Sequence, residues 1–334
     1  MSTEPKPADL RLPSFCIRAP EPVAELDAGN AHLCVYATEE QMGLASALSL
    51  AAQQCRLVAE KGETSLMIMA APSAFAFYRA YVGLAQASHH LQHAIRNTHF
   101  FQFDDYALPI HHPASFRFLL CKHLFTPLAT WTDAAKVHLF EADAPDVEAA
   151  CVRYRDLLLA CGPDLQLKGV GENGHWGFHE PGIPLDGSPD FIRVALSEEN
   201  VVQQMRDHPQ IFPTADSVPR HAYTANVALF MKARVLVEDN IPQASKAFAL
   251  LAGYGSDTVD ASVPTSAVKT HPCAVIRTTS AAAWALLDYR QRGIVTRSAL
   301  DRMAALLAGD QADRRPAFLA TIRAVLATMH LAIE

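Results

Sequence analysis

Residues 169–181 read GVGENGHWGFHEP. They follow an apolar run with Leu165, Leu167 and Val170, which is typical of a buried strand, so the glycine-rich stretch is predicted to leave the carboxyl end of that strand. Open α/β sheets bind their ligands at this edge. Glycines allow a close approach of the backbone to a ligand or a positive φ. An imidazole such as that of His175 titrates near neutral pH and can pass a proton. The stretch therefore predicts an α/β sheet with a ligand site in this loop.

Short β-type runs alternate with longer amphipathic runs on both sides of this loop. The first pair is a strand at 32–37 and a helix at 39–61, which Thr38 and Gln41 are placed to cap. Further runs of the two kinds lie at 65–70, 74–86, 98–103, 147–160, 165–170, 192–196, 222–230, 244–251 and 274–277. This alternation predicts a three-layer α/β/α, Rossmann-like fold with a mostly parallel sheet.

The two ends of the chain differ from this pattern. Residues 1–30 are rich in proline, which favours an extended arm over a packed element. Residues 281–334 are rich in Ala, Leu and Arg with helical spacing at 281–289, 298–307 and 316–333, which predicts a helical C-terminal extension. Residues 31–280 contain no repeat and no linker, so we expect them to form one α/β domain.

Composition excludes several classes of protein. The chain has 334 residues, of which 50% are hydrophobic and 19% charged, so global disorder is excluded. A net charge of -7 argues against nucleic acid as a partner. No apolar stretch approaches the roughly 18 residues of a membrane span, and the N-terminus lacks the features of a signal peptide. Seven cysteines without a C-x-x-C pair fit a reducing compartment. We therefore expect a cytoplasmic protein that contacts neither nucleic acid nor membrane.

A pair of acidic residues provides a second candidate for chemistry. Asp104 and Asp105 follow the apolar run at 98–103, at the end of a predicted buried strand. Crowded carboxylates near apolar side chains tend to include one with a raised pKa, which suits a general base. The alternative is that one aspartate caps the following turn and the other is solvated.

The histidine-rich stretches also have ordinary explanations. The loop at 169–181 could be a tight turn in which His175 and Glu180 only bond to backbone. His175 and His179 have the i, i+4 spacing of metal ligands, but Gly177 and Pro181 argue against a helix there. The three histidines at 89, 90 and 93 fit a polar helix end. We expect no metal site and no cofactor.

Several motifs together resemble one known family. The stretch at 169–181 resembles the pattern G-x-G-x-D-G-H-x-A-F-N-E-P of the glucosamine-6-phosphate deaminase family, which is related to the 6-phosphogluconolactonases. FDDY at 103–106 with HPASF at 112–116, VPRHAYT at 218–224, SKA at 245–247 and SAVKTHP at 266–272 match further motifs of that family in the same order. The resemblance covers residues 32–280 and implies an aldose–ketose isomerisation of an aminosugar phosphate with release of ammonia.

The resemblance also implies roles for individual residues. Asp104 is the position that moves a proton between C1 and C2 of the sugar. His175 is the position that opens the sugar ring, oriented by Asn173 and Glu180. Lys246 is the position that helps to hold the phosphate. The remaining residues expected to bind substrate are Asp105, Ser73, Gly171, Gly174 and Arg193.

The chain departs from the family pattern in the phosphate region. Where the family has a glycine-containing phosphate loop, residues 70–75 read AAPSAF, which limits the close cradle that glycines allow. Asn173 replaces the family's aspartate and supplies no charge to His175. No arginine aligns with the family's phosphate arginine, although Arg193 and Arg206 are near. Three functions stay open: a deaminase or isomerase of an aminosugar with or without a phosphate, a sugar-binding sensor that has lost catalysis, and a sugar lactone hydrolase.

Two further questions follow from these departures. If Phe75 or Pro72 fills the expected phosphate position, a phosphorylated substrate is implausible. If backbone N–H groups of the loop at 71–75 converge there with Lys246, a phosphorylated substrate stays plausible. The proline-rich arm and the helical extension are both suited to contacts between copies of the chain, so a homo-oligomer is also open.

Overall fold

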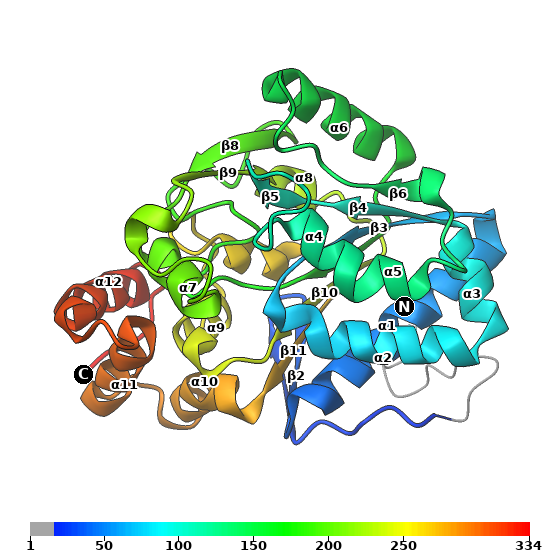
Figure 1. The fold of residues 1–334 in the computed structure, drawn as a ribbon. Coiled ribbons are helices and arrows are strands. Elements are labelled where there is room, and N and C mark those ends of the chain that lie inside the picture. The colour runs from blue at the N-terminus through cyan, green and yellow to red at the C-terminus, as the bar shows by residue number, and fades with distance from the viewer. Residues whose placement is uncertain (1–16) are drawn as a thin grey trace.

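A sheet of eight strands runs through the centre of the computed structural model, which describes residues 17–334 (Figure 1). The strand order is β1-β2-β11-β10-β7-β3-β4-β6, and every neighbouring pair is parallel except β1 with β2. The strands are β1 (Ala24–Ala28), β2 (Ala31–Tyr36), β3 (Thr64–Ile68), β4 (Thr98–Gln102), β6 (Val137–His138), β7 (Leu165–Lys168), β10 (Leu236–Ile241) and β11 (Ala274–Thr279). The predicted mostly parallel α/β sheet is confirmed.

The central strands are buried on both faces. Every residue of β3, β7, β10 and β11 is buried, as expected of parallel strands covered by helices on both sides. The sequence did not predict β10, because its middle reads Glu238-Asp239-Asn240. Two of these polar side chains have partners inside the core: Glu238 pairs with Arg277 at 2.8 Å, and Asp239 pairs with Lys168.

Helices flank the sheet and hold the loops that leave it. The predicted helix at 39–61 is α1, whose N-cap Thr38 accepts a hydrogen bond from the Gln41 N–H at 3.2 Å. It contacts β2, β3, β10 and β11 and carries α2 and α3 on its outer side. The helices are α1 (Glu39–Lys61), α2 (Phe75–Ala87), α3 (His89–Arg96), α4 (Phe116–Leu120), α5 (Thr126–Leu128), α6 (Val147–Cys161), α7 (Glu198–Asp207), α8 (Val227–Phe230), α9 (Ala247–Tyr254), α10 (Ser280–Arg292), α11 (Arg297–Ala308) and α12 (Arg315–Thr328). Short helical turns are η2 (Pro72–Ala74), η3 (Cys121–Phe125), η4 (Ala134–Lys136), η5 (Ala215–Ser217), η6 (Ala244–Lys246), η7 (Pro264–Thr270) and η8 (Ala312–Arg314).

A second, smaller sheet departs from the sequence expectation of a single sheet. Its antiparallel strands are β5 (Asp104–Tyr106), β9 (His221–Ala225) and β8 (Phe191–Ala195), in the order β5-β9-β8. The runs at 192–196 and 222–230 do contain strands, but these pair with each other rather than with the main sheet. Since only Phe103 separates β4 from β5, this small sheet fixes the backbone of Asp104 at the carboxyl end of β4.

The ends of the chain pack against this body. Helices α11 and α12 lie beside α7 and α9 at one edge of the molecule, and α12 ends at Thr328 rather than at 333 (Figure 1). The first half of the predicted arm, residues 1–16, lies outside the described residues. Its last part is a packed element, contrary to expectation: β1 is an edge strand that pairs with β2, and its Leu26 and Ala28 turn toward the core while alternate residues face solvent. Within residues 17–334, no helix combines the length and apolarity needed to cross a bilayer.

The strand order creates a crevice between β3 and β7. The chain moves from β3 to β4 and β6 toward one edge of the sheet, and later from β7 to β10 and β11 toward the other. The loops that leave the carboxyl ends of β3 and β7 therefore run in opposite directions along the sheet. Such a switch point is where open α/β sheets bind ligands.

Candidate functional site

A pocket of about 630 Å³ opens at this switch point. It is formed by the loops after four neighbouring strands together with helix α7. The lining residues are Met69, Ala70, Ala71, Pro72, Ser73, Phe103, Asp104, Phe116, Gly169, Val170, Gly171, His175, Gly177, Phe178, Gln203, Gln204, Asp207, His208, Gln243 and Lys246.

The glycines of the loop after β7 allow His175 to fold back over its own backbone. The Gly171 N–H donates to the His175 carbonyl at 2.9 Å, so the loop closes tightly. A Cβ on Gly171 would lie 2.0 Å from the imidazole of His175. Gly174 and Gly177 have φ of +90° and +62°, in the region that favours glycine. Gly171 and Gly177 line the pocket, whereas Gly174 packs behind it, toward Val263.

Three side chains of this loop form a hydrogen-bonded chain that leads to His175. The Asn173 carbonyl oxygen lies 2.8 Å from His175 Nδ1, and the Asn173 amide donates to Glu180 Oε2 at 2.9 Å. Glu180 also accepts a hydrogen bond from Asn200 on α7. Because an amide oxygen only accepts, it holds the proton of a neutral imidazole on Nδ1 and leaves Nε2 as an acceptor. The alternative of a turn with only backbone bonds is therefore wrong.

Burial sets the charge state of this group. Burial lowers the pKa of His175 to about 3, helped by the positive charges of Lys246 and Lys168. Burial raises the pKa of Glu180, although its hydrogen bonds to Asn200 and Asn173 oppose the change. His175 is thus a neutral imidazole near pH 7, free to accept a proton at Nε2 from a bound molecule.

Asp104 is the second candidate catalytic group that lines the pocket. Its side chain is buried, and its Oδ1 has no hydrogen-bond partner among the described residues. Burial, and then the neighbouring charge of Asp105, raise the pKa of Asp104 well above its usual range. A Cβ on Gly177 would lie 3.3 Å from Asp104 Oδ2, so this glycine lets the histidine loop approach the carboxyl group. An unpaired, desolvated carboxyl group of this kind suits proton abstraction from carbon.

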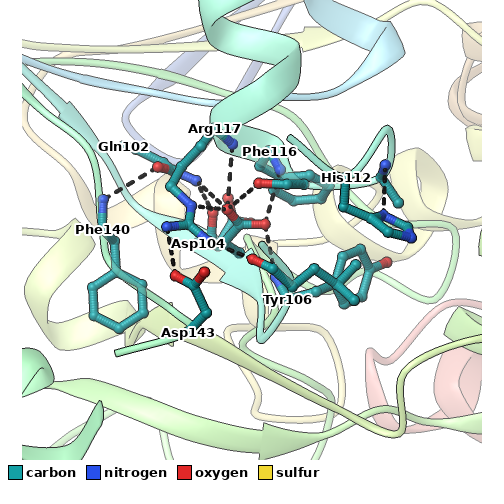
Figure 2. A network of polar contacts seen from close by, with 12 residues as sticks. Gln102, Asp104, Tyr106, His112, Phe116, Arg117, Phe140 and Asp143 are labelled. Atoms are coloured by element: carbon teal, nitrogen blue, oxygen red, sulfur yellow. Dashed lines mark hydrogen bonds and ion pairs between the residues drawn. The ribbon is translucent and has the colours of Figure 1, made fainter. Parts of the chain in front are cut away.

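Asp105 has a different environment and does not line the pocket, contrary to its predicted role in substrate binding. Its carboxylate accepts hydrogen bonds from the Phe116 N–H at 2.8 Å, the Ser115 hydroxyl at 3.0 Å and Arg117 Nε at 3.2 Å. Arg117 in turn binds Asp143 at 2.7 Å, and Figure 2 shows this network around the start of α4. Asp105 thus anchors the start of α4, which corresponds to the capping role considered from the sequence.

Ser73 and Lys246 meet at the other end of the pocket. The Ser73 hydroxyl donates to Gln243 Oε1 at 3.0 Å, and Gln243 and Lys246 both follow β10. Burial lowers the pKa of Lys246 to about 8. Phe75 is turned away, stacked on His123 with ring centroids 4.4 Å apart, and does not line the pocket. The loop from Met69 to Ser73, with Pro72 in it, and Lys246 thus line the same pocket, whereas the ring of Phe75 does not.

Arg193 does not reach the pocket, contrary to its predicted role. It is an exposed residue of β8 and is absent from the lining. Arg206 is nearer, but its guanidinium pairs with Glu172 and donates to the carbonyls of Leu306 and Leu307. It therefore ties α7 to the histidine loop and to α11.

Sequence reasoning missed the contribution of α7. This helix places four polar residues against the pocket, namely Gln203, Gln204, Asp207 and His208. Its sequence is polar on most sides, so no apolar stripe marks it. The available signal was Ser197, a serine followed by two glutamates, whose side chain caps the helix by accepting from the Asn200 N–H at 3.1 Å.

The histidines weighed from the sequence as metal ligands have other surroundings in the structure. His179 Nδ1 accepts from the Val227 N–H at 3.1 Å, and its Nε2 lies 3.2 Å from the Ile183 carbonyl, so both nitrogens have backbone partners. The three histidines of α3, at 89, 90 and 93, lie exposed on that helix.

Comparisons with known proteins agree with the geometry. No protein-family model matches the chain. A glucosamine-6-phosphate deaminase from Geobacillus sp. is 33% identical over 181 residues, which cover 53% of this chain and 67% of the relative. A solved structure of a monomeric glucosamine-6-phosphate deaminase has a TM-score of 0.64 at 27% identity, covering 76% of this chain and 98% of that one.

The fold alone is shared more widely. A 6-phosphogluconolactonase from Thermotoga maritima superposes with a TM-score of 0.55 at 17% identity, covering 74% of this chain and 99% of the other. The sequence agreement with the deaminases and the α/β fold with its histidine loop at the switch point lead to one assignment. The chain belongs to the glucosamine-6-phosphate deaminase family, as a divergent member.

Proposed function

We propose that this chain converts an aminosugar phosphate, glucosamine 6-phosphate, into the corresponding ketose phosphate and ammonia. The observation that carries the proposal is the buried carboxyl group of Asp104, which has an unpartnered oxygen among the described residues and lines one pocket with the neutral imidazole of His175. The pairing supplies one group for proton transfer at carbon and another for proton transfer at oxygen. These are the two kinds of transfer that isomerisation of a cyclic aldose requires.

His175 acts first in this proposal. Its Nε2 takes the proton of the C1 hydroxyl and returns it to the ring oxygen, so that the ring C–O bond breaks and the C1 aldehyde forms. Asn173 holds Nδ1–H throughout, and Glu180 holds Asn173. A bound phosphate beside Lys246 would offset one of the positive charges that lower the pKa of His175, and would thereby make the imidazole a better base when substrate is present.

Asp104 acts on the open chain. It removes the proton from C2, next to the C1 carbonyl, and an enol-type intermediate forms. Return of the proton to C1 leaves an imine at C2, which water hydrolyses to the ketone with loss of ammonia. Burial favours this role because it raises the proton affinity of the carboxyl group.

The phosphate is assigned to the end of the pocket between the loop from Met69 to Ser73 and Lys246. The hydroxyl of Ser73 and the ammonium of Lys246 supply donors, and the loop runs into a continuous helical segment, η2 followed by α2. Phe75 leaves this end open because it stacks on His123. Proline at position 72 removes one N–H from the cradle, so we expect weaker phosphate binding than a glycine loop would give.

The competing functions are distinguished by the same observation. Hydrolysis of a sugar lactone breaks an acyl bond and removes no proton from carbon. It therefore does not require the unpaired carboxyl group of Asp104. A sensor needs binding only, and gives no reason to keep a buried carboxyl group without a partner, which costs stability.

The experiment is to incubate the purified chain with glucosamine 6-phosphate and to measure ammonia and ketose phosphate. Parallel reactions use unphosphorylated glucosamine and 6-phosphogluconolactone. In D₂O, we expect deuterium at C1 of the ketose product. Asp104→Asn should abolish turnover while still binding the substrate. Folded protein that binds the substrate without turnover would support a sensor, and consumption of the lactone alone would support a hydrolase.

A further inference from the structure

The hairpin of β1 and β2, at the edge of the main sheet, gathers four potential metal ligands on one face. The antiparallel register sets Glu25 directly opposite Cys34, and Asp27 directly opposite His32. Residues two apart in a strand point to the same side. Glu25 and Asp27 of β1 therefore share one face of the hairpin with His32 and Cys34 of β2. The turn between the strands, at Gly29 and Asn30, brings these four side chains together although the site described above uses none of them.

The donor atoms have the spacing of a coordination sphere. One ligand atom each from Glu25, His32 and Cys34 can be chosen so that all three lie within 4.8 Å of one another. His32 Nε2 is 3.5 Å from Glu25 Oε1, and Cys34 Sγ is 4.0 Å from the same oxygen. Ligands around a tetrahedral zinc ion, at about 2.0 to 2.3 Å from the metal, are separated from one another by similar distances.

The second imidazole nitrogen also has a partner. His32 Nδ1 lies 3.0 Å from Asp27 Oδ1. In zinc sites the nitrogen that does not bind the metal commonly donates to a carboxylate, which fixes the ring and makes it a stronger ligand. The hairpin therefore holds three ligand groups together with the carboxylate that would orient the histidine.

We propose that this hairpin binds a zinc ion through Glu25, His32 and Cys34, with Asp27 orienting His32 and with water at the fourth position. A thiolate, an imidazole and a carboxylate form a donor set that suits zinc, whereas calcium and magnesium prefer oxygen ligands alone. The buried Cys34 forms the floor of the site, and the half-exposed Glu25 leaves a path for the ion.

The local charge favours a cation at this position. Two acidic side chains flank His32, whose Nε2 lies 3.5 Å from Glu25 Oε1 and whose Nδ1 lies 3.0 Å from Asp27 Oδ1. Two arginines next to the hairpin have partners of their own: Arg277, opposite Cys34 on β11, pairs with Glu238, and Arg290 of α10 donates to the backbone carbonyl of Asp27.

The location indicates a structural role for the ion. His32 lies near the amino end of β2, whereas the pocket lies at the carboxyl ends of β3, β4, β7 and β10. An ion held by Glu25 on one strand and by His32 and Cys34 on the other would cross-link the edge strand β1 to the sheet. Binding to the folded state alone would also raise the stability of the whole protein.

The test is a titration of the reduced, metal-free full-length chain with Co²⁺, which reports thiolate and tetrahedral coordination by its absorption. We expect one Co²⁺ per chain, a thiolate-to-cobalt charge-transfer band in the near ultraviolet, and displacement by one equivalent of Zn²⁺. Cys34→Ser should remove the band. Cys161→Ser is the matched control, because Cys161 Sγ lies 4.0 Å from His99 Nδ1 and offers another cysteine beside a histidine. It should leave the band unchanged.

Two further variants keep the proposal falsifiable if Cys34→Ser does not fold. Glu25→Gln should weaken Co²⁺ binding, and Asp27→Asn should weaken it by about 10- to 100-fold through the orientation of His32. Circular dichroism verifies that each variant is folded. The proposal is overturned if the wild-type chain gives no charge-transfer band, if the band disappears in Cys161→Ser, or if folded Glu25→Gln and Asp27→Asn both bind Co²⁺ as tightly as the wild type.

Discussion

The two ends of the pocket are built in different ways. At the proton-transfer end, Gly171, Asn173 and Glu180 fix His175 through a closed turn and a chain of hydrogen bonds, opposite the unpartnered Asp104. At the phosphate end, Ser73 and Lys246 lie beside a loop in which alanine and proline stand where the family has glycine. For the proposed reaction, we infer that this chain keeps strict geometry for proton transfer and looser geometry for anchoring the substrate.

The largest expected effect is at Asp104. Asp104→Asn removes the proposed base and should lower kcat by about 10²- to 10⁴-fold. Burial disfavours the charged carboxylate, and the amide carries no charge, so Asp104→Asn should leave the melting temperature equal or higher. Steady-state assays together with thermal denaturation measure both quantities.

Asp105→Asn is the matched control for this comparison. It makes the same chemical change one residue away, but it removes a carboxylate that accepts from Arg117 and from the backbone at the start of α4. We expect a loss of stability of about 3 kcal/mol, because a buried ion pair is broken. If Asp105→Asn were the more stable and Asp104→Asn the less stable variant, the assignment of the two aspartates would be reversed.

These neighbouring aspartates also show how far sequence reasoning reaches. The pattern located the acidic pair at a strand end, but it could not say which side chain faces the pocket, because that depends on β5 pairing with β9 in the small sheet. The ends of α1 were predictable because their signals are local: Thr38 caps the first turn, and the helix ends at Lys61, just before Gly62. Strand β10 was not predictable, because its polar residues Glu238 and Asp239 have their partners in distant parts of the chain.

The second largest effect is expected at Gly171. Gly171→Ala places a Cβ where the imidazole of His175 lies, so the ring must move and kcat should fall by about 10²-fold, a loss typical of a misplaced catalytic group. The control is Gly83→Ala, in α2, where nothing lies within 4 Å of the added Cβ. That variant should keep full activity and gain slightly in stability, since alanine favours helix. Full activity in Gly171→Ala would show that His175 is not held as described.

At the phosphate end, Lys246 allows a test that uses pH. Lys246→Ala should raise KM for the phosphorylated substrate by about 10-fold or more and leave KM for unphosphorylated glucosamine unchanged, because a charge-assisted contact is lost. In the wild type, the pKa of Lys246 near 8 means that the ammonium is present below this pH and is lost above it. KM should therefore rise as the pH passes about 8, and this rise should be absent in Lys246→Ala. A pH profile of KM that is the same in both proteins would remove Lys246 from the phosphate site.

The smallest expected effect is at Ser73. Its hydroxyl already donates to Gln243 at 3.0 Å, so a phosphate must either share this donor or compete with the amide oxygen for it. Ser73→Ala should raise KM by about 5-fold, which corresponds to one neutral hydrogen bond of about 1 kcal/mol, and should leave kcat unchanged. Steady-state kinetics on the phosphorylated and unphosphorylated sugars measure this. A fall in kcat instead of a rise in KM would mean that the loop after β3 takes part in positioning the reacting carbons, and the contrast between a strict end and a loose end of the pocket would no longer hold.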